Sequence, residues 1–168
     1  MKSTKIIARA GLIGALYVLL SLITFPVASG AIQFRVSEAL CVLPLILPET
    51  VPALAIGCML SNLITGCAPM DIVFGSIITL VASLFTCLTG KMIKNVILKI
   101  AIGGFFPVIL NALFLPLIWI WCYGAIEYLY YLQVLFLIIS QSGAVYLLGT
   151  PLYFYVKKLK TKNLSFLQ

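Results

Sequence analysis

Arg35 and Glu38 are the residues whose types and spacing first suggest chemistry, because they stand three apart in a chain that is almost free of charge. Apolar runs flank the two residues, so both belong at or near the edge of a membrane, where an ionisable group is costly without a partner or a task. One interpretation is that they pair and cap a helix, with Ser37 as its N-cap. The other, compatible with the first, is that they form the rim or gate of a polar cavity that opens to the outside.

Four further polar side chains interrupt apolar sequence and extend this candidate site: Asn62, Asp71, Asn111 and Gln141. Carboxylates and amides accept hydrogen bonds from the amidine edge of a heterocycle, and amides also donate to a ring carbonyl. The aromatic residues that could stack on the face of such a ring are Phe34, Phe74, Tyr123 and Tyr146. The set predicts a site for a flat, hydrogen-bonding heterocycle.

A second aromatic group fits the surface of a membrane better than a ligand. It comprises Trp119, Trp121, Tyr123, Tyr128, Tyr130 and Tyr131. Because Trp and Tyr gather at membrane–water interfaces, we predict an interfacial belt here.

The composition places these residues in an all-α polytopic membrane protein that forms a single domain over residues 1–168. The chain is 63% hydrophobic and 9% charged, and its mean hydropathy is +1.20. Its apolar runs are long enough to cross a bilayer as helices. They are apolar on both parities, unlike the strands of a membrane barrel. The first run is also too long for a cleaved signal peptide.

We predict six transmembrane helices from the apolar runs: Ile6–Phe25, Glu38–Leu47, Thr50–Thr65, Asp71–Leu88, Ile100–Trp121 and Leu129–Val156. The second is short for a span, and Pro44 and Pro48 break or kink it.

The basic residues set the orientation of these helices. Ten of the 11 fall into three clusters: Lys2, Lys5 and Arg9; Lys91, Lys94 and Lys99; and Lys157, Lys158, Lys160 and Lys162. Six spans with both termini cytoplasmic put all three clusters inside, as the positive-inside rule requires. The net charge of +7 is therefore no nucleic-acid footprint. The same topology places Arg35, Glu38, Asp71 and Glu127 at outer ends, whereas Glu49 falls on an inner turn, where we expect it to be solvated.

Catalysis and metal binding find little support in the residue inventory. The chain has no histidine, and its five cysteines show no CxxC spacing, so we read Cys41, Cys58, Cys67, Cys87 and Cys122 as packing residues and expect no metal or cofactor. The motif GxxxxGK[ST] of P-loop ATPases is absent, as are HExxH and GxSxG. We therefore do not expect an enzyme.

Small residues line two faces of the first segment. Ala8, Gly11 and Ala15 share one face, and Ala10 and Gly14 lie beside it. Such faces let helices approach closely in lipid, and they serve either internal packing or a partner surface.

Four stretches make the chain resemble a known family: IQFRVSEALCVLPLI, GCMLSNLITG, MDIVFGSIITLVASLFT and VYLLGTPL. They look like the QueT family, whose members are substrate-binding (S) components of energy-coupling factor (ECF) transporters for queuosine precursors. The resemblance extends from the first segment to the last.

The resemblance implies a bacterial cell-membrane protein with six helices and a substrate site near the outer face. It also implies a membrane coupling subunit and two ATPase subunits as partners, with toppling of the S component carrying substrate across. The coupling subunit would dock on Ala10 and Gly14 or on Gly11 and Ala15. The substrate would be a 7-deazaguanine, either pre-queuosine 1 or queuine. Gln141 stands where the family often has a glutamate, which leaves the precursor open.

Two alternatives stay open beside this reading. The chain could be an S component for another vitamin, or a stand-alone channel or secondary transporter, for which we would expect internal repeats that the sequence does not display.

Overall fold

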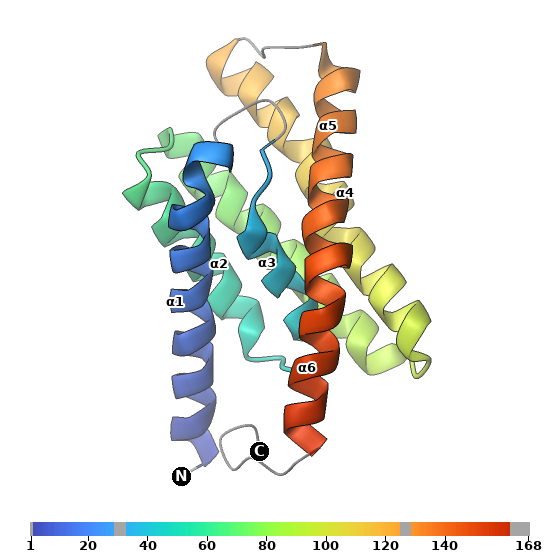
Figure 1. The fold of residues 1–168 in the computed structure, drawn as a ribbon. Helices are drawn as coiled ribbons and strands as arrows, with labels where there is room; N and C mark the ends of the chain where they lie inside the picture. Colours follow the sequence, from blue (N-terminus) through green and yellow to red (C-terminus); the bar gives the residue numbers. More distant parts are fainter. Residues whose placement is uncertain (1, 29–32, 125–128, 162–168) are drawn as a thin grey trace.

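The computed structural model describes residues 2–28, 33–124 and 129–161. In these ranges the chain is helical and contains no strand, which confirms the all-α prediction (Figure 1). The elements are α1 (Lys2–Ala28), η1 (Val36–Leu45), α2 (Thr50–Ile64), α3 (Pro69–Met92), α4 (Val96–Tyr123), α5 (Tyr130–Ser142), η2 (Gly143–Leu148) and α6 (Gly149–Thr161). Glu127, Tyr128 and Lys162 lie outside the described residues, as do the side chains of Lys2 and Tyr123.

Within the described residues, four helical stretches are long and apolar enough to cross a membrane: Thr4–Pro26, Pro69–Met92, Val96–Cys122 and Tyr130–Thr161. The last runs through α5, η2 and α6, so the predicted sixth segment is one continuous helix with a π-helical turn in its middle. The second and third predicted segments are shorter apolar helices, Val36–Leu45 and Thr50–Ile64. Six complete spans therefore remain a prediction.

The short second segment is a 3₁₀ helix, η1, that contains Pro44 and is buried from Ser37 to Leu45. A 3₁₀ helix rises about 2.0 Å per residue against about 1.5 Å in an α-helix, so ten residues reach roughly 20 Å. Its sequence is short for a span because it lies inside the bundle and is wound more tightly.

Glycines let three neighbouring helices press against η1. A Cβ atom on Gly90 of α3 would collide with the backbone of Leu45, and one on Gly103 of α4 would lie 2.5 Å from its side chain. On Gly149 of α6 the added atom would meet the carbonyl of Ala39 at 2.9 Å. The three positions accept only glycine at these distances, so α3, α4 and α6 pack directly against the buried helix η1.

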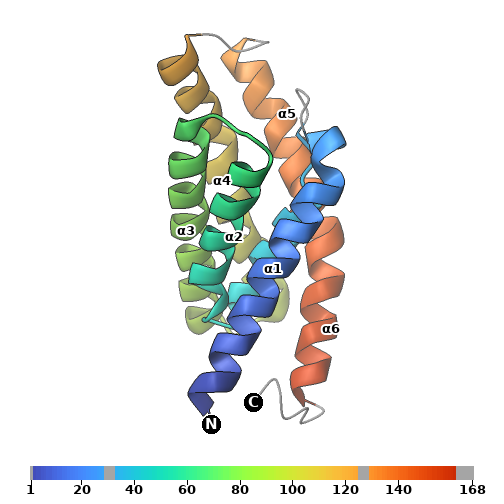
Figure 2. The ribbon, with the colours of Figure 1, turned by 90° about the vertical axis from the view of Figure 1, so that its left-hand side faces the viewer.

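In contrast, α1 lies at the periphery. Only 17% of its apolar stretch is buried, compared with 39–44% of the other three stretches. It approaches α2 closely where Gly14 faces Ala53 and Gly57 faces Tyr17. α1 and α2 run side by side in Figures 1 and 2.

A nearly buried ion pair joins the N-terminal part of α1 to the turn before α2. The Nη2 atom of Arg9 lies 2.9 Å from Oε1 of Glu49, and the two side chains are only 6% and 13% exposed. The prediction that Glu49 is solvated is therefore wrong, because Glu49 pairs with Arg9. Nothing in the spacing of the first helix indicates that Arg9 turns toward the protein.

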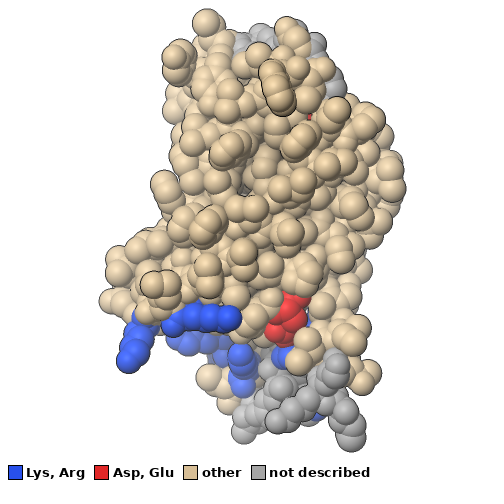
Figure 3. All heavy atoms as spheres, turned by 180° about the vertical axis from the view of Figure 1, so that it is seen from behind, with Lys and Arg blue, Asp and Glu red and all other residues tan. Residues whose placement is uncertain are grey.

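The described termini and lysines lie toward one end of the molecule. α1 begins and α6 ends at the lower end in Figure 1. In Figure 3 the Lys and Arg side chains gather toward that end, and the face above them is almost free of charge. This arrangement agrees with the clustering that the sequence displays, while the cytoplasmic orientation of this end stays a prediction.

Candidate ligand-binding cavity

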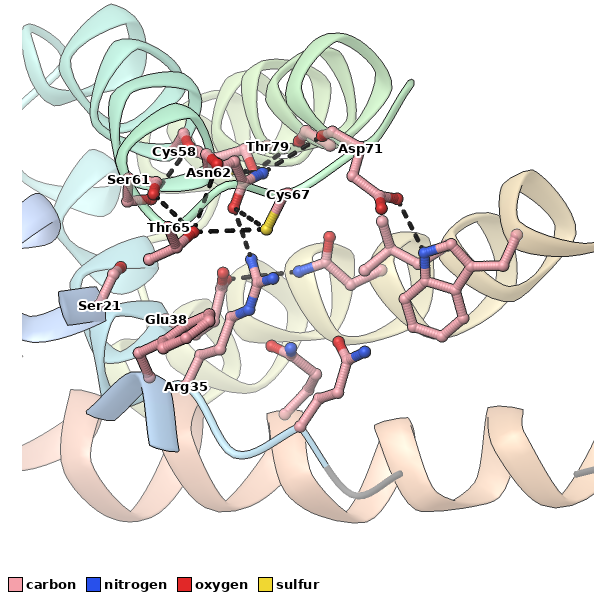
Figure 4. Close-up of a pocket in the computed structure, with 17 residues that line it drawn as sticks. Ser21, Arg35, Glu38, Cys58, Ser61, Asn62, Thr65, Cys67, Asp71 and Thr79 are labelled. Atoms are coloured by element: carbon pink, nitrogen blue, oxygen red, sulfur yellow. Dashed lines mark hydrogen bonds between the residues drawn. The ribbon is translucent and has the colours of Figure 1, made fainter. Parts of the chain in front are cut away.

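A cavity of about 170 Å³ lies beside the first turn of η1, between the surrounding helices. Residues from η1, α1, α2, α3, α4 and α5 line it. All six polar residues nominated from the sequence are among them: Arg35, Glu38, Asn62, Asp71, Asn111 and Gln141. In Figure 4 the labelled members converge on one space from separate helices.

Glu38 is the most enclosed charged group of the cavity, since it is only 2% exposed. Its Oε1 accepts a hydrogen bond of 2.7 Å from the hydroxyl of Tyr17. Its Oε2 accepts from the thiol of Cys41 at 3.2 Å and from the amide of Asn111 at 3.4 Å. Three donors from three elements thus fix the carboxylate at the floor of the cavity.

Arg35 and Glu38 do not pair as the first interpretation required. Arg35 instead donates from Nη1 to Oδ1 of Asn62 at 3.4 Å, and its backbone is the N-cap of η1. Ser37 is therefore not the cap; its hydroxyl accepts a hydrogen bond of 2.8 Å from Ser21 of α1. The guanidinium, a permanent cation, lines the cavity and reaches toward Asn62 of α2 (Figure 4).

Asn62 and Asp71 form the wall between α2 and α3. Asn62, 4% exposed, accepts from Arg35 and donates from Nδ2 to the carbonyl of Asp71 at 3.2 Å. The carboxylate of Asp71 accepts a hydrogen bond of 2.8 Å from the indole Nε1 of Trp119. No other hydrogen bond to this half-buried carboxylate occurs within the described residues, so its second oxygen is open to a ligand.

Gln141 supplies an acceptor that no described group satisfies. Its side chain is 2% exposed and lines the cavity, and Oε1 has no hydrogen-bond partner. Buried polar atoms are nearly always paired, so this oxygen is available to a donor that enters the cavity.

The aromatic predictions need correction. Phe25 and Trp119 are the aromatic side chains among the described lining residues. Phe74 lines a separate apolar groove between α3 and α4, and the hydroxyl of Tyr146 donates to the carbonyl of Ala101 at 2.8 Å. Phe34 packs beside Gly143, and the side chain of Tyr123 is outside the described part.

Trp119 and Tyr17 are the functional residues that sequence reasoning missed. The predicted belt includes Trp119 and Trp121, but positions two apart on an α-helix point in directions about 200° apart, so the two side chains face different surroundings. Tyr17 stands in an apolar run, but Ser21 follows it at helical spacing and marks the same face. These two spacings were the available signals.

The two small-residue faces of α1 have different surroundings. Gly14 is packed, because a Cβ atom on it would lie 3.1 Å from the carbonyl of Ala53, and Ala10 beside it is half-buried. Gly11 has no atom within 4 Å of its added Cβ, and Ala15 is exposed. Only the face of Gly11 and Ala15 is therefore available to a partner.

No group of three or more Cys, Asp or Glu residues that could hold a metal ion occurs in the described part of the chain.

Comparison with known proteins agrees with this arrangement. A sequence model of the QueT transporter family matches residues 7–158, which is nearly the whole chain. Comparison with curated proteins and with solved structures finds no match. Together with the four long apolar helices, the family match identifies the chain as a multi-pass protein of the cell membrane that belongs to the QueT transporter family.

Proposed function

We propose that this chain is the substrate-binding S component of an ECF-type importer and that its cavity binds a 7-deazaguanine precursor of queuosine. The observation that carries the proposal is the convergence of six polar side chains, from well-separated parts of a transporter-family sequence, on one cavity. Such groups are expensive inside a membrane unless they serve a pathway or a ligand.

The size and chemistry of the cavity suit one heterocycle. A volume of about 170 Å³ is comparable to cavities of roughly 150 Å³ that hold a benzene in other proteins. Glu38 and Gln141 can accept from the amino and ring N–H groups of the base, Arg35 can donate to its carbonyl, and Trp119 and Phe25 offer stacking faces.

The charge of the lining points toward a cationic precursor. Two carboxylates, on Glu38 and Asp71, face one guanidinium, on Arg35. The open oxygen of Asp71 suits a ligand ammonium. Between the two candidates, the small volume favours pre-queuosine 1, which carries only an aminomethyl group, over the bulkier queuine.

The partners follow from the family and from α1. We propose that a membrane coupling subunit docks on the exposed face of Gly11 and Ala15 and that two separate ATPase subunits hydrolyse ATP. Small residues at this face permit close contact between helices in lipid.

Thermal unfolding of the detergent-solubilised protein tests the ligand. Pre-queuosine 1, queuine, guanine, riboflavin, thiamine and biotin would be compared, since a ligand at 100 times its Kd stabilises by about 2.7 kcal/mol. We expect a shift with a deazaguanine, and a loss of affinity of roughly tenfold or more in Glu38→Gln and Asp71→Asn. Ser83→Ala, a buried change outside the cavity, is the matched control.

Full binding by Glu38→Ala and Asp71→Ala would refute the site. A shift with one vitamin alone would keep the S-component architecture and replace the ligand. No shift with any compound, combined with uptake in cells lacking a coupling subunit, would favour a stand-alone transporter.

Cys67 provides an independent test of where the ligand sits. Its half-buried thiol lines the cavity, whereas Cys122, also half-buried, lines the apolar groove. A bound deazaguanine should slow modification of Cys67 by a small thiol reagent and leave Cys122 unaffected. Equal slowing at both thiols, or at neither, would place the ligand elsewhere.

A further inference from the structure

Tyr17 contacts the cavity machinery without lining the cavity. It is fully buried on α1, and its hydroxyl donates to Oε1 of Glu38 at 2.7 Å. A buried phenol needs a hydrogen-bond partner, but a backbone carbonyl would serve equally well. Here the partner is the one carboxylate that closes the floor of the cavity.

The hydroxyl of Tyr17 is also the strongest of the donors to Glu38. The contacts from Cys41 and Asn111 are longer, at 3.2 and 3.4 Å, and both end on Oε2. Thiols are weak donors, and Cys41 belongs to the same helix as Glu38. Oε1 is therefore held by Tyr17, and the plane of the carboxylate depends on it.

Tyr17 also packs closely against α2. A Cβ atom on Gly57 of α2 would lie 3.0 Å from Cβ of Tyr17, so the glycine permits the close approach that seats the phenol between α1 and α2. The backbone of Glu38 is held in η1, which the glycine contacts of α3, α4 and α6 immobilise. Both ends of the hydrogen bond are thus preset before a ligand enters.

We propose that Tyr17 is a positioning residue of the ligand site: it holds the Glu38 carboxylate in the orientation that a ligand N–H group meets. The inference rests on the proposed function, since it assigns the open lone pairs of Glu38 to the deazaguanine. Without the hydroxyl, the carboxylate turns, and binding includes the free-energy cost of ordering it again.

Tyr17→Phe is the direct test, because it removes one oxygen and keeps the ring. The matched control is Tyr153→Phe: Tyr153 is 1% exposed but belongs to the core cluster around Val42 and Leu45. We expect the Kd for pre-queuosine 1 to rise at least about fivefold in Tyr17→Phe and to stay within about twofold in Tyr153→Phe. Equal affinities in the two variants would overturn the proposal.

Infrared spectroscopy of the protein without ligand gives a readout that a merely structural role would not move. The chain has four carboxylate side chains, so the band lost in Glu38→Gln can be assigned to Glu38. This band should shift in Tyr17→Phe and remain in place in Tyr153→Phe. An unmoved band in Tyr17→Phe would show that the hydroxyl does not set the state of Glu38.

The two measurements separate this inference from the function on which it rests. If the unmodified protein binds no deazaguanine, the proposed function fails, while the infrared band still decides whether Tyr17 controls Glu38. If the unmodified protein binds a deazaguanine, and Tyr17→Phe shifts the Glu38 band without changing the Kd, the positioning role is refuted and the proposed function stands.

Discussion

At the scale of single residues, Trp119 and Trp121 occupy two different environments although they are only two positions apart on α4. Trp121 is 89% exposed, at the position expected of an interfacial belt, whereas Trp119 reaches into the cavity and donates to Asp71. The chain contains no other tryptophan. Its intrinsic fluorescence therefore comes from one residue in the cavity and one on the surface.

We expect pre-queuosine 1 to change this fluorescence through Trp119 alone. The change should persist in Trp121→Phe and disappear in Trp119→Phe, which also removes the hydrogen bond to Asp71. Titration of the two variants in detergent measures both the signal and the Kd. A signal that disappears with Trp121 instead would mean that the ligand binds outside the cavity.

Charged and amide residues of this site could be recognised from sequence because each interrupts an apolar run. Arg35, Glu38 and Asn111 stood out for that reason, since polar groups inside a membrane need a task. Tyr17 did not stand out, because a phenol is at home in an apolar helix. Its role depends on which carboxylate its hydroxyl meets across the bundle, and one-dimensional spacing does not contain that distance.

At the scale of elements, η1 shows where sequence prediction stops. The run Glu38–Leu47 and its prolines predicted a short, interrupted segment, but neither its 3₁₀ winding nor its central position. These depend on glycines far away in the chain, Gly90, Gly103 and Gly149, whose missing side chains admit it. The long helices were predictable because their hydrophobic length alone determines them.

Gly90→Ala should destabilise the fold strongly. Its added methyl group collides with backbone atoms of Leu45, which cannot move aside as a flexible side chain would. We expect a loss of about 1–3 kcal/mol, seen as a lower unfolding temperature in detergent. Gly11→Ala, made on an open helix face, is the control and should be neutral or slightly stabilising. Similar unfolding temperatures for the two variants would contradict the tight packing of η1.

The ion pair between Arg9 and Glu49 predicts a second effect at this scale. Arg9→Met leaves the nearly buried Glu49 without its cation, which should cost about 3–5 kcal/mol of stability. The double change Arg9→Met and Glu49→Leu should recover most of the loss, since it removes both charges. Unfolding temperatures measure both. If Arg9→Met unfolds at the same temperature as the double variant, Glu49 is not destabilised by the loss of its cation, and the prediction is wrong.

At the scale of the whole molecule, the charged side chains at the two ends differ in where they point. Arg35, Glu38 and Asp71 all turn into the cavity, while the lysines gather toward the opposite end. In the part of the chain that the structure describes, the exposed surface of the upper half therefore consists mainly of apolar side chains.

Adding a charge to this upper surface should impair transport without impairing binding. Leu129, 74% exposed at the start of α5, and Met92, 80% exposed at the end of α3, offer matched sites. We expect Leu129→Lys to reduce uptake by the assembled transporter at least severalfold and Met92→Lys to leave it near normal. Both variants should bind ligand in detergent with unchanged Kd. Equal uptake by the two would refute the asymmetry.

The reason lies in the solvation of the molecule if it tilts. A charged side chain at the centre of a bilayer costs about 2.5–3.5 kcal/mol on insertion scales. A membrane protein with exposed charges at both ends therefore resists tilting, because tilting would move those charges from water into lipid. Here Arg35, Glu38 and Asp71 line the cavity, and the described upper surface has almost no exposed charge that would resist tilting. The polar groups that would receive the ligand are thereby also hidden from the lipid through which it would be carried.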